Sequence, residues 1–209
     1  AIYIGKPSQP IIYKPSVLNR WLILFLWTTV VVEMTGKLLG TQPVVKVAMY
    51  NIWNGIEFVF YFLCFYHILG SKRRKNVVGL FLLVFIIFFS GNFFIWQGYG
   101  EYNSHTYTVG ASIVIFLCLL SFYDILSSDK LVTIIPVQSI CFFLGGLLIF
   151  YAGTITNAAV FNRMVSKNVD DAIRLYKLIN HNLNVVLYGG IVISLIFDIR
   201  SKKIAKIFH

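Results

Sequence analysis

The chain has 209 residues, of which 58% are hydrophobic and only 12% are charged, and its net charge is +10. A soluble domain carries about 25% charged residues, so this composition excludes an ordinary water-soluble globular protein. We interpret the positive charge as a topology signal at helix ends that meet anionic lipid headgroups, rather than as a surface for nucleic acid. The composition therefore predicts a polytopic α-helical membrane protein that contacts membrane lipids and binds no nucleic acid.

Six apolar segments divide the chain, and each is long enough to cross the hydrocarbon layer as a helix. They cover residues 21–38, 47–69, 77–96, 107–126, 134–161 and 178–199. Membrane strands would show alternation over about ten residues, and the segments lack it. We expect one all-α bundle of six transmembrane helices over residues 1–209, with seven in the intact protein if a further helix precedes Ala1.

The distribution of basic residues predicts the orientation of the helices. The link at residues 71–76 contains four consecutive basic residues, which favours the cytoplasm. Alternation then puts twelve basic residues inside, including Lys130 and the tail 200–209, and six outside. We expect a plasma (inner) membrane protein with a cytoplasmic carboxyl terminus. Asp170 and Asp171 open an apolar-periodic run in the long outer loop, so the sixth helix should begin near them and project beyond the membrane.

Glu57 is the most informative polar residue, because charged side chains at membrane depth are costly and usually face protein or water. It lies about ten residues into the second segment, or about 15 Å below the outer surface at 1.5 Å per residue. Helical spacing places it on one polar and aromatic face, with Tyr50, Trp53, Asn54, Tyr61 and Cys64. The face predicts a ligand, ion or proton site; the alternative is a protonated glutamate hydrogen-bonded to a neighbouring helix.

Glu33 permits two interpretations. It precedes Lys37 by four residues, in the favourable order for an ion pair on a helix. Alternatively, Glu33 lines the same cavity as Glu57 from the adjacent helix.

Other polar side chains concentrate in the outer half of the predicted bundle, which suggests an outward-facing cavity with Glu57 at its floor. We expect this cavity, walled by aromatic side chains, to take a small ligand whose identity the sequence leaves open. The candidate ligand-binding residues are Glu57, Asn54, Trp53, Glu33, Asn92, Trp96, Tyr151, His181, Asn184 and Tyr188.

Several kinds of chemistry have no signature in the sequence. The motifs HExxH, GxSxG and GxxxxGK[ST] do not occur, so we expect no enzyme, no cofactor and no metal site. The three cysteines lie in apolar runs, where they should be buried small residues. The glycines of the last two segments should let these helices approach closely; they are Gly145, Gly146, Gly153, Gly189 and Gly190.

Four stretches of the chain form a recognisable pattern, namely Val32-Glu33-Met34-Thr35-Gly36, residues 50–62, Phe150-Tyr151-Ala152-Gly153 and residues 179–188. This pattern resembles a family of small multi-pass inner-membrane proteins of Bacteroidota-type bacteria. The resemblance implies a seven-helix fold, and it implies that Glu33, Glu57, Tyr151, Asn184 and Tyr188 belong to the family pattern. It brings no assigned activity and therefore transfers no catalytic residue.

These features together predict a sensory or ligand-binding membrane module. It would detect a ligand outside or within the outer leaflet and pass a helix rearrangement to a cytoplasmic or membrane signalling partner, because its own loops are too short for a catalytic domain. A small proton-coupled transporter that uses Glu57 is the first alternative. A lipid-directed enzyme with Glu57 or His181 as base and a structural subunit of a membrane complex are the others.

Overall fold

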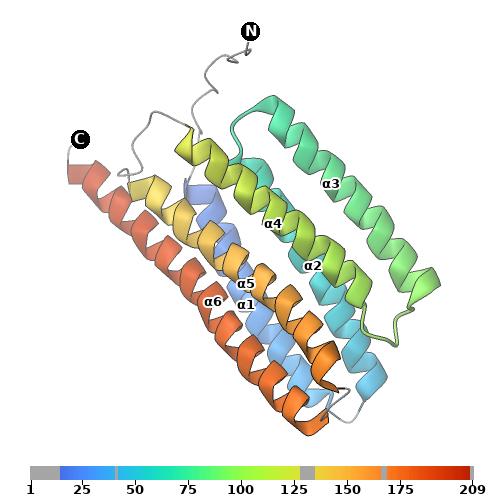
Figure 1. The fold of residues 1–209 in the computed structure, drawn as a ribbon. Coiled ribbons are helices and arrows are strands. Elements are labelled where there is room, and N and C mark those ends of the chain that lie inside the picture. The colour runs from blue at the N-terminus through green and yellow to red at the C-terminus, as the bar shows by residue number, and fades with distance from the viewer. Residues whose placement is uncertain (1–14, 41, 128–134, 166–168, 208–209) are drawn as a thin grey trace. The chain divides into compact units, whose positions relative to one another are not determined.

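The computed structural model describes residues 15–40, 42–127, 135–165 and 169–207, and these residues form helices without any strand (Figure 1). The elements are α1 (Pro15–Leu38), α2 (Pro43–Ile68), α3 (Lys72–Gly91), the π-helix η1 (Asn92–Trp96), α4 (Ser104–Leu126), α5 (Ile135–Val165) and α6 (Val169–Ile207). The prediction of an all-α membrane bundle is confirmed.

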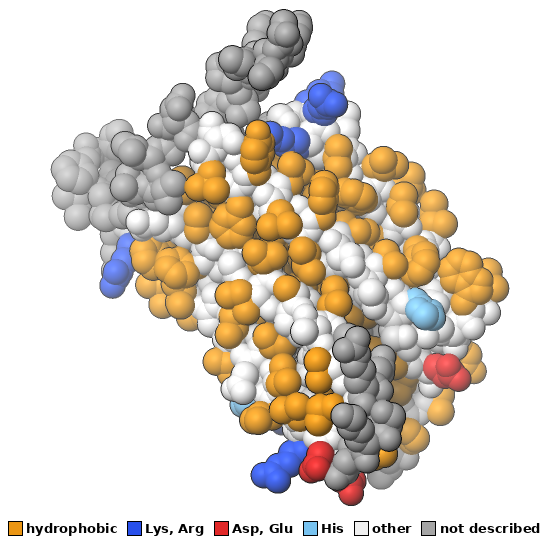
Figure 2. Space-filling model, in the orientation of Figure 1, with side chains coloured by type: hydrophobic (Ala, Val, Ile, Leu, Met, Phe, Trp, Pro, Cys, Tyr) orange, Lys and Arg blue, Asp and Glu red, His pale blue; other side chains and the backbone are white. Residues whose placement is uncertain are grey.

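Five of the described helices are long and apolar enough to cross a membrane, namely α1, α3 with η1, α4, α5 and α6. The exception is α2, because polar residues such as Asn51, Asn54 and Glu57 interrupt its apolar sequence. Large apolar side chains point outward, among them Trp27, which is 67% exposed, and Ile87, which is 65% exposed. Hydrophobic side chains dominate the helix faces seen in Figure 2. Such surfaces need lipid around them.

Most of the helices begin before the apolar segments that predicted them, because capping residues add polar turns. Pro43 opens α2, a position where proline's missing N–H is harmless. The Ser71 side chain accepts a hydrogen bond from the Arg74 backbone N–H, 3.3 Å away, and so caps α3. The sixth helix begins at Val169 with both aspartates in its first turn, as expected.

The chain divides into two compact units, unit 1 (1–113) and unit 2 (114–209), with the boundary inside α4. Aromatic rings form the core of unit 1. The Phe58 ring of α2 lies 5.4 Å from the Phe85 ring of α3 and 5.7 Å from the Tyr107 ring of α4, between centroids. Gly110 lets α4 approach the Phe58 ring, because a Cβ there would lie 2.7 Å from it.

Unit 2 is dominated by α5 and α6, which run antiparallel side by side (Figure 1). A Cβ added to Gly190 would lie 2.9 Å from the Phe142 carbonyl oxygen and 3.1 Å from the Gly146 Cα, so these backbones touch. The expected packing role is confirmed for Gly146 and Gly190. It is wrong for Gly145 and Gly189, because a Cβ at either position would meet nothing within 4 Å.

Hydrogen bonds join α5 to α6 on both sides of the glycine contact. The Ser139 hydroxyl donates to the Ser194 carbonyl oxygen at 2.8 Å. In the other direction along the hairpin, the Asn157 side-chain amide donates to the Tyr176 carbonyl at 3.2 Å and to Asn180 Oδ1 at 3.0 Å. These bonds fix the register of the two helices.

Some predictions concern parts of the chain that lie outside the described residues. Lys130 and the segment ahead of residue 15 belong to this group, as do the side chains of residues 201–209. The membrane orientation, the inner-membrane location and the single bundle stay predictions.

Candidate functional site

The predicted polar face of α2 contains Glu57 near the centre of the helix. Its Oε1 accepts a hydrogen bond from the Tyr61 hydroxyl, 3.0 Å away, and Tyr61 is fully buried while Glu57 is half-buried. Trp53 and Asn54 are also half-buried. The Trp53 ring stacks on the Phe25 ring of α1 with centroids 5.7 Å apart. The face thus packs partly against α1.

Glu33 is exposed on α1 and meets the polar face of α2. The Tyr50 hydroxyl donates to Glu33 Oε2 at 3.3 Å. This bond turns the Glu33 side chain toward the neighbouring helix α2, and a cavity shared with Glu57 stays a prediction.

A second polar group lies where α3 ends and α4 begins, and we call it the asparagine cluster (Asn51, Asn92, Gln97, Asn103 and Thr106). Asn92 is buried on the π-helix, a helix type common at functional sites. Its Nδ2 donates to Gln97 Oε1 at 2.8 Å and to Thr106 Oγ1 at 2.9 Å. Gly98 follows with a φ of 76°, a left-handed conformation that suits glycine and ends the helix.

Asn51 joins this cluster to α2. Its side chain is fully buried, and its Nδ2 donates to the Glu101 carbonyl at 2.6 Å. Its Oδ1 accepts from the Asn103 backbone N–H at 3.0 Å. Asn51 therefore tethers the α3–α4 loop. Sequence reasoning missed this role because the partners are backbone atoms about 50 residues away, which no periodicity reveals.

Three side-chain atoms of the asparagine cluster are buried without a hydrogen-bond partner. They are Asn92 Oδ1, Asn103 Oδ1 and Asn103 Nδ2. The two residues are 0% and 3% exposed. Each buried group without a partner costs about 1–3 kcal/mol. Two acceptors and one donor of the cluster thus lack hydrogen-bond partners in the described part of the chain.

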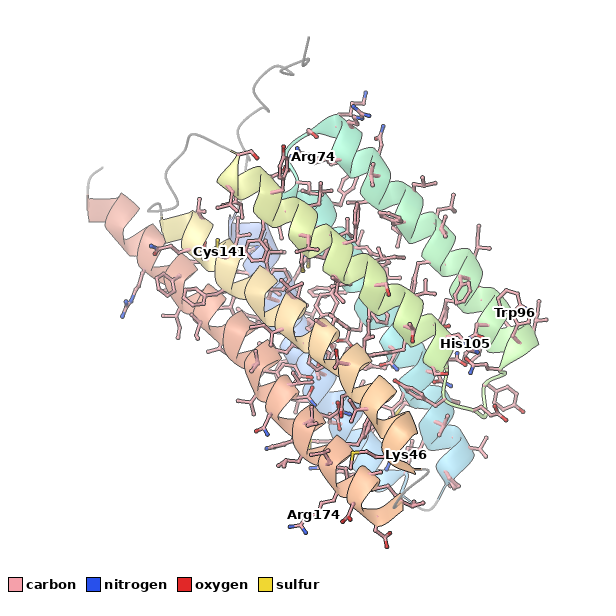
Figure 3. The ribbon with its side chains drawn as sticks, in the orientation of Figure 1. Lys46, Arg74, Trp96, His105, Cys141 and Arg174 are labelled. Carbon is pink, nitrogen blue, oxygen red and sulfur yellow. The ribbon has the colours of Figure 1, made fainter. Side chains whose placement is uncertain are left out.

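Trp96 lies beside this cluster without lining it. Its side chain is 66% exposed and its ring packs on Phe88, 5.7 Å between centroids. Figure 3 shows Trp96 and His105 at one end of unit 1 and Arg74 at the opposite end of α3. An exposed tryptophan at a helix end is typical of the membrane interface.

The remaining candidates belong to unit 2. Tyr151 is fully buried on α5, Asn184 and Tyr188 are half-buried on α6, and His181 is exposed on α6. The ten predicted site residues thus divide between the two units, and the common cavity stays a prediction. In the described part of the chain, no three His, Cys, Asp or Glu side chains gather as a metal site would require.

Comparison with protein-family models, with curated proteins and with solved structures gave no match. The class of protein follows from the helices themselves. Their length, apolar composition and outward apolar faces make it a multi-pass α-helical membrane protein.

Proposed function

We propose that the protein is a sensory or ligand-binding membrane module whose asparagine cluster takes a small neutral polar molecule. The observation that carries this proposal is the set of three buried amide atoms without partners on Asn92 and Asn103. A ligand with both a donor and an acceptor, such as a primary amide, would recover the free energy that these atoms forfeit.

The surroundings of the cluster suit a site reached from one side of the membrane. Residues 99–102 of the α3–α4 loop are exposed, and they cover the cluster at the end that the topology prediction puts outside. The loop is short and is held by side-chain bonds to Asn51, so it can move without unfolding a helix.

The orientation prediction also supplies a route for a signal. The opposite end of α3 has the basic residues Lys72 to Lys75, where a cytoplasmic partner with acidic groups could bind. A ligand that changes the π-helix at Asn92 would turn or shift α3 and alter this basic surface.

Replacement of Asn103 by leucine tests the proposal. The Asn103 side chain has no partner in the described structure, whereas its backbone N–H bonds to Asn51. Asn103→Leu should therefore keep or raise the unfolding midpoint, since a buried polar group without a partner is removed. Binding of acetamide and urea, measured by saturation-transfer NMR on the detergent-solubilised protein, should fall several-fold.

Asn182→Leu is the matched control, because Asn182 is exposed on α6 and its side chain bonds only within its own helix. It should leave the NMR signal unchanged. Equal saturation transfer in the wild-type protein and in Asn103→Leu would refute the proposal.

A proton-coupled carrier is the second candidate, and it is favoured by Glu57 near the centre of α2 with a tyrosine hydroxyl on its carboxylate. In proteoliposomes loaded with a pH-sensitive dye and given an inside-negative potassium diffusion potential, uncoupled proton entry through Glu57 should acidify the lumen without any co-substrate. Glu57→Gln should abolish this acidification and Asn103→Leu should not, so the two functions are separable.

A further inference from the structure

Unit 2 has an apolar groove along the outside of the α5–α6 hairpin. Its volume is about 380 Å³, and it is lined by α5 residues between Cys141 and Ile149 and by α6 residues between Val185 and Ile193. Because the helices are antiparallel, Cys141 lies opposite Ile193 and Ile149 lies opposite Val185. The groove therefore runs along the helix axes for about 12 Å at 1.5 Å per residue.

Missing side chains create the groove. Gly145 and Gly189 line it, and a Cβ on either would meet no atom within 4 Å. The contact between α5 and α6 is made by their neighbours Gly146 and Gly190 instead. Gly145 and Gly189 are thus not needed for helix packing, and the space above them is open.

A charge lies in line with the groove. Arg200 is exposed on α6, seven residues beyond Ile193. Seven residues make two helical turns, so Arg200 lies on the same face as Ile193 and about 10 Å farther along. In the sequence, the apolar run of α6 ends at Ile199, directly before Arg200. A guanidinium at such a level pairs well with phosphate.

We propose that this groove binds one acyl chain of an anionic phospholipid whose phosphate pairs with Arg200. The groove has the direction of a lipid chain and an apolar lining. Arg200 adds a cation at headgroup depth that selects an anionic lipid over a zwitterionic one. The proposal is independent of the asparagine cluster, which lies in unit 1.

Native mass spectrometry of the protein released from detergent tests this binding, with dioleoyl phosphatidylglycerol and dioleoyl phosphatidylcholine as probes. The wild-type protein should retain phosphatidylglycerol several-fold better than phosphatidylcholine. Arg200→Gln should remove this preference while retaining phosphatidylcholine at the wild-type level. The double variant Gly145→Leu/Gly189→Leu should fill the groove and lose both lipids.

The double variant should keep the wild-type helical circular dichroism and unfolding midpoint, because both new side chains enter open space. If it misfolds, Gly189→Leu alone gives the same comparison with half of the groove filled. Unchanged phosphatidylglycerol retention in a folded groove-filled variant would overturn the proposal. The proposal would also be overturned if the wild-type protein cross-links as a dimer in the membrane and the groove-filled variant does not, since the occupant of the groove would then be a second copy of the chain.

Discussion

Substitution of Asn51 gives the sharpest test of how the outer end of unit 1 is held together. The side chain is fully buried and makes two short hydrogen bonds to backbone atoms, 2.6 Å to the Glu101 carbonyl and 3.0 Å to the Asn103 N–H. A third contact, to the Tyr99 carbonyl, is 3.5 Å long and adds little. Asn51→Leu keeps the volume of the side chain and leaves one backbone acceptor and one backbone donor buried without partners.

Each of the two orphaned backbone groups costs about 1–3 kcal/mol, less what solvent recovers as the loop opens. We therefore expect Asn51→Leu to lower the free energy of unfolding by about 2–4 kcal/mol. A thiol-reactive fluorescent dye can report unfolding in mixed micelles in a Cys141→Ala background, because Cys64 and Cys118 are fully buried in the folded chain whereas Cys141 is partly exposed.

Asn54→Ala is the matched control, since Asn54 lies on the same helix, is half-buried and takes no part in the tether. It should change the unfolding free energy by less than about 0.5 kcal/mol. If Asn51→Leu and Asn54→Ala lower the free energy of unfolding equally, the hydrogen bonds of Asn51 do not stabilise the α3–α4 loop and the prediction is wrong.

The α5–α6 hairpin supplies two further predictions. Gly190→Ala should be about 1–3 kcal/mol less stable than Gly189→Ala. Both variants gain the same helix propensity, but only the alanine at position 190 pushes a Cβ against the Phe142 carbonyl oxygen. Similar unfolding midpoints of the two variants in thermal scans would contradict the backbone contact. Ser139→Ala should lower the free energy of unfolding by about 0.5–1.5 kcal/mol, because it loses the hydrogen bond to α6. Ser112→Ala, whose hydrogen bond stays within α4, should lower it by about a few tenths of a kcal/mol at most in the same scans.

Hydropathy is enough to predict the helices, because the bilayer requires about 20 apolar residues per span whatever the tertiary structure. It cannot predict where the helices start. The first turns of α2 and α3 are fixed by Pro43 and by the Ser71 cap, which lie outside the apolar runs. The start of α6 was predictable because Asp170 and Asp171 are a local signal within the helix itself.

The candidate site was predictable only in part, and the reason is the kind of partner that each residue has. Asn92 was found because a buried asparagine in an apolar run stands out. The pair Asn51 and Asn103 was missed, because the Asn51 side chain bonds to the backbone N–H of Asn103 in a loop. Such contacts depend on tertiary structure, which the sequence pattern does not show. The membership of the seven-helix family, which was inferred from residues such as Glu57 and Tyr151, stays a prediction.

The two candidate sites of unit 1 share one helix, and this decides how they can influence each other. Asn51 and Glu57 are six residues apart on α2, or about 9 Å along the axis. If the proposed ligand displaces the α3–α4 loop, it breaks the bonds from Asn51 to the Glu101 carbonyl and the Asn103 N–H, and we expect the outer end of α2 to adjust. Glu57 moves with it, because its bond to Tyr61 lies within the same helix. Under the proposed function, a polar ligand at the asparagine cluster would thus change the surroundings of Glu57 without touching it, which is the coupling that either a sensor or a carrier requires.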